Sequence, residues 1–169
     1  MSPIVLVEGQ SDVAALTTLA EHRGLAQRMR VVDMGGVTNV RRHVAQLAAS
    51  DPEAVVLGLC DLRERRFMER ARPALAEIFV CDRDLEDELI RALGPERALD
   101  VLAGLDELAR FRTFQAQPEW RARPVTEQLR RFAGTRSGRK AVLAAALSAA
   151  LTPSTTPTPL RRLLDLVEG

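Results

Sequence analysis

The sequence predicts an α/β fold: a Rossmann-like parallel sheet of about four strands, flanked by helices, with a helical C-terminal section. Short apolar runs alternate with helical patterns up to Pro95, and this alternation is typical of parallel strands joined by helices. Beyond Pro95 the strand signal disappears. A chain of 169 residues is long enough to bury one core but short for two full domains.

The predicted strands are the apolar runs at residues 4–7, 29–33, 54–60 and 78–81. The predicted helices beside them span residues 11–22, 38–49 and 84–93. Glycine and proline mark the helix ends, because glycine favours the turn after a helix and proline cannot continue one. These residues are Gly24, the pair Asp51 and Pro52, and the pair Gly94 and Pro95.

The C-terminal section is predicted from helical patterns at residues 96–110, 124–132 and 137–151, with residues 111–124 as a loop. The run TPSTTPTP at residues 152–159 is predicted as a stiff linker to a final helix at 160–167, because its three prolines each remove a backbone donor. The expected organisation is an α/β core at 1–95, a helical section packed on it at 96–151, and the linker with its terminal helix at 152–169.

The net charge is only +1, but acidic and basic residues are concentrated in separate parts of the sequence. Residues 82–107 contain nine acidic residues and three arginines, whereas residues 110–140 contain nine basic residues and two glutamates. Either block alone is most simply a solvated surface. Together the blocks suit a site that holds metal ions beside a polyanion.

Cys60 and Cys81 each follow an apolar run, which predicts buried strand residues of a reduced, cytoplasmic protein. Neither has a second cysteine or a histidine at ligand spacing, so the sequence contains no zinc motif. No apolar run approaches the roughly 20 residues that a bilayer requires, and the first strand begins at Ile4. We therefore expect neither a membrane span nor a signal peptide.

Acidic residues follow every predicted strand. They are Glu8 and Asp12 after the first, Asp33 after the second, Asp61 after the third, and Asp82, Asp84 and Glu86 after the fourth. A single carboxylate at a strand end usually caps a helix, but acids at four strand ends are harder to explain by capping alone, since these ends share one edge of a parallel sheet. Crowded carboxylates require cations, and oxygen-only ligands favour Mg²⁺ or Mn²⁺ over zinc. Such a site fits phosphodiester chemistry with two metal ions.

Lys140 is the only lysine among 24 basic residues, and a compact ammonium can approach a phosphate where a guanidinium does not fit. Chance retention of one lysine is the alternative. The segment TRSGRK lies at a predicted helix start, where backbone N–H groups and cations together suit a phosphate. The predicted nucleic-acid contacts are Arg130, Arg131, Arg136, Arg139 and Lys140.

Three aromatic residues, Phe111, Phe114 and Trp120, lie in or beside the basic block. Aromatic rings among arginines can stack on nucleic-acid bases. With only six aromatic residues in the chain, anchoring of the helical section to the sheet is the favoured interpretation.

Several of these features resemble the Toprim domain, which topoisomerases, bacterial primases, small RNA-maturation nucleases and OLD-family nucleases share. They are VEG at the end of the first strand, Asp12 three residues after its glycine, GG after the second strand, and Asp61 at the end of the third. The segments LEDELIRALG, FRTFQAQPEW and RRFAGTRSGRK are similar to the OLD branch, especially to short actinobacterial proteins described as Toprim nucleotidyl transferase/hydrolase domains. The resemblance implies a Toprim-type sheet and a metal-dependent nuclease.

The resemblance also implies roles for single residues. Glu8 matches the Toprim glutamate, a metal ligand or general acid/base, and Lys140 matches a lysine near the scissile phosphate. The predicted metal ligands are therefore Glu8, Asp12, Asp61, Asp84, Glu86 and Asp87. Arg63 departs from the pattern, because it stands where the family has the second acid of an Asp-x-Asp pair. Glu64, or Asp82 with Asp84, would then supply the missing oxygens, or the site would be weakened or inactive.

The predicted function is therefore metal-dependent phosphodiester hydrolysis on nucleic acid, with Mg²⁺ or Mn²⁺ and with DNA favoured over RNA. OLD-type proteins carry an ATPase upstream, but no G-x-x-x-x-G-K-[ST] loop occurs here, so an ATP-driven step would need a separately encoded ATPase. The alternative, favoured by Arg63, is a catalytically impaired Toprim module that acts as an adaptor for nucleic acid or for such an ATPase. Primase-like nucleotide polymerisation is weaker, because the sequence has no evident zinc or template-binding domain.

Overall fold

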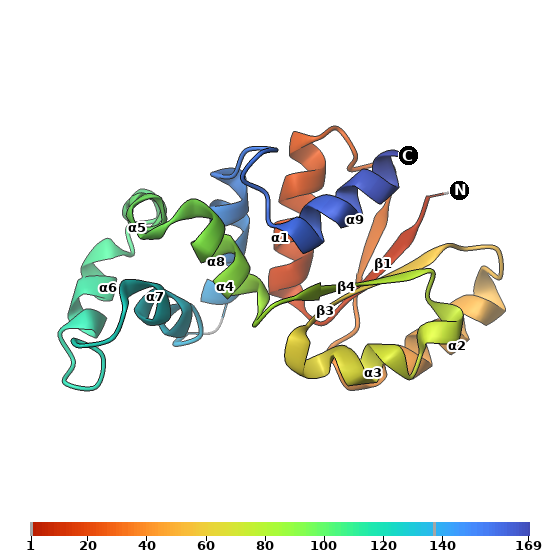
Figure 1. Cartoon of the computed structure of the whole chain (residues 1–169), viewed down its shortest axis with the longest axis horizontal. Helices are drawn as coiled ribbons and strands as arrows, with labels where there is room; N and C mark the ends of the chain where they lie inside the picture. Colours follow the sequence, from red (N-terminus) through yellow and green to blue (C-terminus); the bar gives the residue numbers. More distant parts are fainter. Residues whose placement is uncertain (1, 137) are drawn as a thin grey trace.

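The computed structural model describes residues 2–136 and 138–169, and its centre is a parallel sheet with the strand order β2-β1-β3-β4 (Figure 1). The strands are β1 (Ile4–Val7), β2 (Arg30–Asp33), β3 (Val56–Asp61) and β4 (Glu77–Cys81). The predicted α/β class is confirmed, and each strand boundary lies within two residues of its prediction. The order puts β1 beside β3, so the residues that follow these two strands become neighbours.

Side-chain alternation along the strands divides the core into two layers. In β1, Val5 and Val7 join the larger cluster, whereas Ile4 and Leu6 join the smaller one. Helices α1 (Gln10–His22), α4 (Leu85–Leu93), α8 (Arg139–Ala149) and α9 (Thr158–Glu168) contribute to the larger cluster. Of these, α1 and α9 pack on the strands β2 and β4, respectively, and α8 packs on α1 and α4. The smaller layer is covered by α2 (Val40–Ser50) and α3 (Arg65–Glu69), seen below the sheet in Figure 1.

Three single-turn helices complete this second layer: η1 (Val37–Asn39), η2 (Leu62–Glu64) and η3 (Arg72–Ala74). The sequence patterns predict no element between residues 61 and 77. The helices between residues 61 and 77 are too short to show a hydrophobic repeat. This segment is held in place because Met68, Ala71 and Leu75 pack into the smaller cluster.

The helical section contains α5 (Pro95–Gly104), α6 (Leu108–Gln115) and α7 (Val125–Ala133) and extends to the left of the sheet in Figure 1. Two predictions were wrong here. The expected helix at 96–110 is interrupted after Gly104, where Asp106 adopts a positive φ of 56°. The expected loop at 111–124 begins with helical residues, because Phe111 and Phe114 lie one turn apart and bury the same face of α6. The predicted start of α8 at Ser137 lies outside the described residues.

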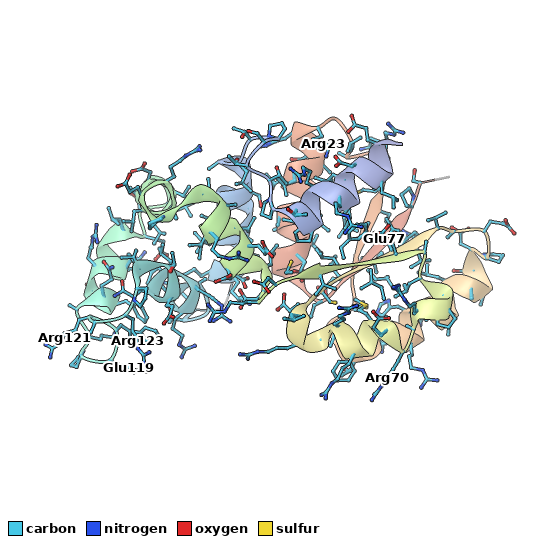
Figure 2. All side chains as sticks on the ribbon, viewed as in Figure 1. Arg23, Arg70, Glu77, Glu119, Arg121 and Arg123 are labelled. Atoms are coloured by element: carbon cyan, nitrogen blue, oxygen red, sulfur yellow. The ribbon has the colours of Figure 1, made fainter. Side chains whose placement is uncertain are left out.

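The terminal helix α9 returns to the sheet and buries Leu160, Leu163, Leu164 and Val167 in the larger cluster. Arg23 donates a hydrogen bond to Asp165 at 2.8 Å, and Figure 2 shows Arg23 beside this helix.

Cys60 and Cys81 are buried and free, and burial raises the pKa of the Cys60 thiol to about 12. Both thiols therefore stay protonated and act as small apolar side chains. Among the described helices, none has the length and apolar character needed to cross a bilayer.

Candidate metal centre

Three carboxylates converge at the carboxyl-terminal edge of the sheet. Glu8 follows β1, Asp61 ends β3, and Glu64 lies one helical turn later, at the end of η2. One oxygen from each of the three lies within 4.8 Å of the others. We call this group the acid cluster. Its third carboxylate comes from Glu64, which the sequence offered only as one of several replacements for the acid missing at Arg63.

A cavity of about 190 Å³ opens beside this cluster. We call it the metal cavity; its lining residues are Glu8, Gly9, Ser11, Asp12, Gly36, Asp61, Leu85, Glu86 and Lys140. Gly36 adopts φ 114°, which only glycine tolerates readily, and donates its backbone N–H to the Glu8 carbonyl at 2.9 Å. The GG turn thus brings backbone close to the cavity.

Asp12 and Glu86 face the metal cavity from two helix starts. Asp12 accepts the Gly9 N–H at 3.0 Å, so it caps α1 as well as lining the cavity. Glu86 is 3% exposed, and its Oε2 lies 3.3 Å from Lys140 Nζ. Its other oxygen, Oε1, is buried without a hydrogen-bond partner among the described residues. Such an orphaned carboxylate oxygen fits a hard cation.

The electrostatics of the cavity point the same way. Burial, followed by the charges of Asp12, Asp84, Glu8 and Glu86, raises the pKa of Asp61 to about 7. Burial raises the pKa of Asp12 to about 7, although the hydrogen bond from the Gly9 N–H lowers it in part. Burial, together with the hydrogen bond and the charge of Glu8, raises the pKa of Glu64 to about 8. At neutral pH these groups cannot all stay ionised together without a cation, so the donor set fits Mg²⁺ or Mn²⁺.

Lys140 lines the metal cavity beside Glu86. Burial would lower its pKa, but the charges of Glu86, Asp84 and Asp61 outweigh burial and raise the pKa above its ordinary value. The ammonium therefore remains charged at neutral pH. The Lys140 side chain is 52% exposed, so a ligand can reach it. It can hold a phosphate against the acidic edge.

Two of the predicted metal ligands are engaged elsewhere. Asp84 is the N-cap of α4, accepting the Asp87 N–H at 2.9 Å, and it also pairs with Arg130. Burial would raise the pKa of Asp84, but these two partners lower it below its ordinary value. Asp87 accepts Arg91 Nε at 2.6 Å, and neither Asp84 nor Asp87 lines the metal cavity. Asp82 is exposed.

A second, polar cavity of about 450 Å³ adjoins the first, since Glu86 and Lys140 line both. We call it the basic groove; it is lined by Arg83, Asp84, Glu86, Trp120, Glu127, Arg130, Arg131, Gly134 and Lys140. Three of the five predicted nucleic-acid contacts, Arg130, Arg131 and Lys140, therefore meet in one groove.

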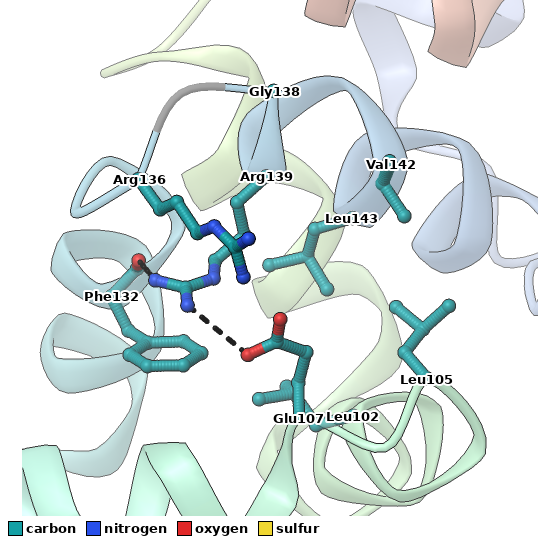
Figure 3. Close-up of a pocket in the computed structure, with 9 residues that line it drawn as sticks. All are labelled: Leu102, Leu105, Glu107, Phe132, Arg136, Gly138, Arg139, Val142 and Leu143. Carbon is teal, nitrogen blue, oxygen red and sulfur yellow. Dashed lines mark hydrogen bonds and ion pairs between the residues drawn. The ribbon is translucent and has the colours of Figure 1, made fainter.

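The other two predicted contacts, Arg136 and Arg139, line a separate pocket of about 300 Å³ (Figure 3). Arg139 donates to Glu107 at 3.1 Å and lies 4.1 Å above the ring of Phe132. With a side chain that is 10% exposed, Arg139 holds α8 against the helical section. Arg136 is exposed beside it.

Solved structures share this architecture. The C-terminal region of the Burkholderia pseudomallei OLD protein superposes with a TM-score of 0.68 at 19% identity, over 98% of this chain and 96% of that one. The chain has the fold of the C-terminal region of OLD proteins. The same region of the Xanthomonas campestris pv. campestris OLD protein gives a TM-score of 0.65 at 19% identity, over 98% and 93% of the two chains. The resemblance to OLD-type Toprim domains is thus confirmed for the fold. No family model matches the sequence, and no curated protein gives a significant match.

Proposed function

We propose that this OLD-type Toprim fold is a Mg²⁺- or Mn²⁺-dependent nuclease that hydrolyses phosphodiester bonds, with DNA as the favoured substrate. The observation that carries the proposal is the acid cluster of Glu8, Asp61 and Glu64 beside the single lysine, at the edge of a parallel sheet. The two free, buried cysteines suit a reduced cytoplasm. A separately encoded ATPase is the partner that we would expect for any ATP-driven step.

The acid cluster would hold one divalent ion, and Asp12 with Glu86 would contribute to a second position. Bound there, the ions would activate water and neutralise the leaving oxygen. Glu8, whose carboxylate lies with those of Asp61 and Glu64, would also accept a proton from the attacking water. Lys140 would grip a non-bridging oxygen of the scissile phosphate, and Arg130 and Arg131 would hold the strand in the basic groove.

Cleavage assays test the proposal. Supercoiled plasmid and a single-stranded oligonucleotide are incubated with Mn²⁺ and the wild-type protein, the Glu8→Gln variant or the Glu69→Gln variant. Glu69 is a matched control, because this residue of α3 lies outside the metal cavity and pairs with Arg65 and Arg72. We expect Mn²⁺-dependent cleavage by the wild type and Glu69→Gln, and a loss of about 100-fold or more in Glu8→Gln. Equal cleavage by all three proteins, or none by the wild type, would remove the proposal.

The adaptor function is a second candidate because Arg63 stands in place of an acid. Arg63 is exposed, however, and Glu64 restores a third carboxylate to the cluster. Calorimetric titration with Mn²⁺ separates the two candidates. A nuclease site should bind Mn²⁺ in the micromolar range, whereas an adaptor that lacks a ligand should bind it no better than millimolar, which is at least about 4 kcal/mol weaker.

A further inference from the structure

The aromatic residues of the helical section divide into a buried cluster and one partly exposed ring. The Phe111 and Phe132 rings meet edge to face with centroids 5.3 Å apart, and both residues are buried. Phe114 is also buried and stacks on Trp120 at 5.2 Å. Trp120 alone of these four residues is partly exposed, and it lines the basic groove. Trp120 therefore packs against the core while leaving part of its surface accessible from the groove.

The backbone holds Trp120 in place. Gln128 is 3% exposed and donates its Nε2 to the Trp120 carbonyl at 2.7 Å. The Arg123 N–H donates to the same carbonyl at 2.8 Å. A buried amide fixed on α7 thus sets the position of a loop residue that lies in the groove. A tryptophan whose backbone is fixed in this way, and whose ring also stacks on Phe114, loses little conformational freedom when a ligand stacks on it.

Basic side chains line the groove together with Trp120. Lys140 lines both cavities, and Arg130 and Arg131 line the groove. Arg130 is paired with Asp84, whereas Arg131 is exposed and forms no ion pair within the described part of the chain. An aromatic ring beside cations matches the alternation of base and phosphate along a single strand. In a duplex, both faces of each internal base are covered by the neighbouring bases of the stack, so no base face is free to stack on Trp120.

We propose that Trp120 stacks on the base of an unpaired nucleotide next to the scissile phosphodiester, so that the chain acts on single-stranded nucleic acid or on unpaired ends. The inference rests on the proposed function, because the same strand must cross the metal centre. Phosphates contact Arg131 and Lys140, and one base covers the exposed face of the indole. DNA and RNA share this chemistry.

The sequence offers a direct reporter, since Trp120 is the single tryptophan and the chain has no tyrosine. Its fluorescence is titrated in EDTA, where no cleavage intervenes, with thymidine and uridine oligomers of about 12 nucleotides. Two comparison ligands are an abasic oligomer of equal length, with the same phosphates, and a duplex with closed ends. We expect strong quenching by at least one of the single strands and little by the abasic oligomer or the duplex. Equal quenching by the abasic oligomer or by the duplex would overturn the inference, as would no quenching at all.

Variants separate stacking from packing when the affinity for a labelled oligomer is measured by anisotropy. Trp120→Leu should weaken single-strand affinity by roughly 5- to 100-fold, and Trp120→Phe should restore most of it. Phe67→Leu is the control, because Phe67 also lies beneath two arginines, Arg66 and Arg70, but lines neither cavity. Unchanged affinity in Trp120→Leu, or an equal loss in Phe67→Leu, would contradict the inference.

The binding experiments and the cleavage assays can refute the role of Trp120 and the nuclease proposal separately. Quenching by single strands without Mn²⁺-dependent cleavage would support base stacking and remove the nuclease proposal. Cleavage at an unchanged rate in Trp120→Leu, with no quenching in the wild type, would keep the nuclease and overturn the role of Trp120.

Discussion

At the scale of single residues, the acid cluster brings carboxylates together at a cost in stability. Burial and mutual repulsion raise the pKa values of Asp61 and Glu64 to about 7 and about 8, so each is held less stably as an anion than in the unfolded chain. Carboxylates whose only role was to stabilise the fold would not be buried next to one another without a cation. Such a conflict is typical of functional sites.

Asp61→Asn should therefore stabilise the metal-free protein. The unfolded aspartate ionises near about pH 4 and the folded one near about 7, so the penalty grows between these values and is complete at about pH 8. After allowance for solvent screening, we expect a gain on the order of 1 kcal/mol, a rise of about 2–4 °C in Tm in EDTA. Mn²⁺ should then raise the Tm of the wild type more than that of the variant. Asp100→Asn, at an exposed position on α5, is the control; a lower Tm for Asp61→Asn in EDTA would contradict this account.

Lys140 should matter for cleavage rather than for metal binding. Lys140→Met removes the cation that faces the phosphate, and we expect cleavage to slow by roughly 100-fold while Mn²⁺ still raises the Tm. Arg161→Met, at an exposed position on α9, should leave both readings unchanged. The role of Lys140 would be refuted by a full cleavage rate in Lys140→Met.

At the scale of elements, α4 depends on the cap that Asp84 provides. Asp84→Ala removes the hydrogen bond to the Asp87 N–H and the ion pair with Arg130. We expect a loss of about 1–2 kcal/mol in the free energy of unfolding. Asp84→Asn keeps a capping oxygen and should cost less. Denaturant titration measures both, and equal losses in the two variants would show that the cap contributes nothing beyond the charge.

The strands and the acids that follow them could be predicted because apolar runs and strand ends are local features of the sequence. Glu64 could not be assigned in the same way. Its place in the acid cluster depends on the single turn η2 and on β1 lying next to β3, and neither leaves a pattern in the sequence. A spacing of three residues from Asp61 was the only local signal. The direction of Arg139 likewise depends on packing over Phe132.

At the scale of the whole molecule, ion pairs connect the acidic block at residues 82–107 to the basic block at residues 110–140. Among the described residues, four ion pairs join them: Glu107 with Arg110 at 3.4 Å within one turn, and, over longer sequence separations, Asp84 with Arg130, Glu86 with Lys140 at 3.3 Å, and Glu107 with Arg139 at 3.1 Å. The helical section is thereby held against the acidic edge of the sheet. Its basic side chains line the route along which a polyanion would reach the metal cavity.

The terminal helix should be required for stability of the whole fold. Leu163 is fully buried on α9, and Leu163→Ala should cost about 2–5 kcal/mol, seen as a large fall in Tm. Leu166→Ala on the same helix is the control, because Leu166 is 41% exposed. A similar Tm for both variants would mean that α9 does not pack on the sheet in solution.

The central claim is that Glu8, Asp61 and Glu64 share a divalent ion. Crystals soaked in Mn²⁺ test it most directly, since manganese gives an anomalous signal that locates the ion without reference to activity. We predict an anomalous peak at the acid cluster, where it borders the metal cavity, within coordinating distance of one oxygen from each of these three carboxylates. A cavity without a peak at saturating Mn²⁺, or a peak bound by Asp82 and Asp84 alone, would contradict it.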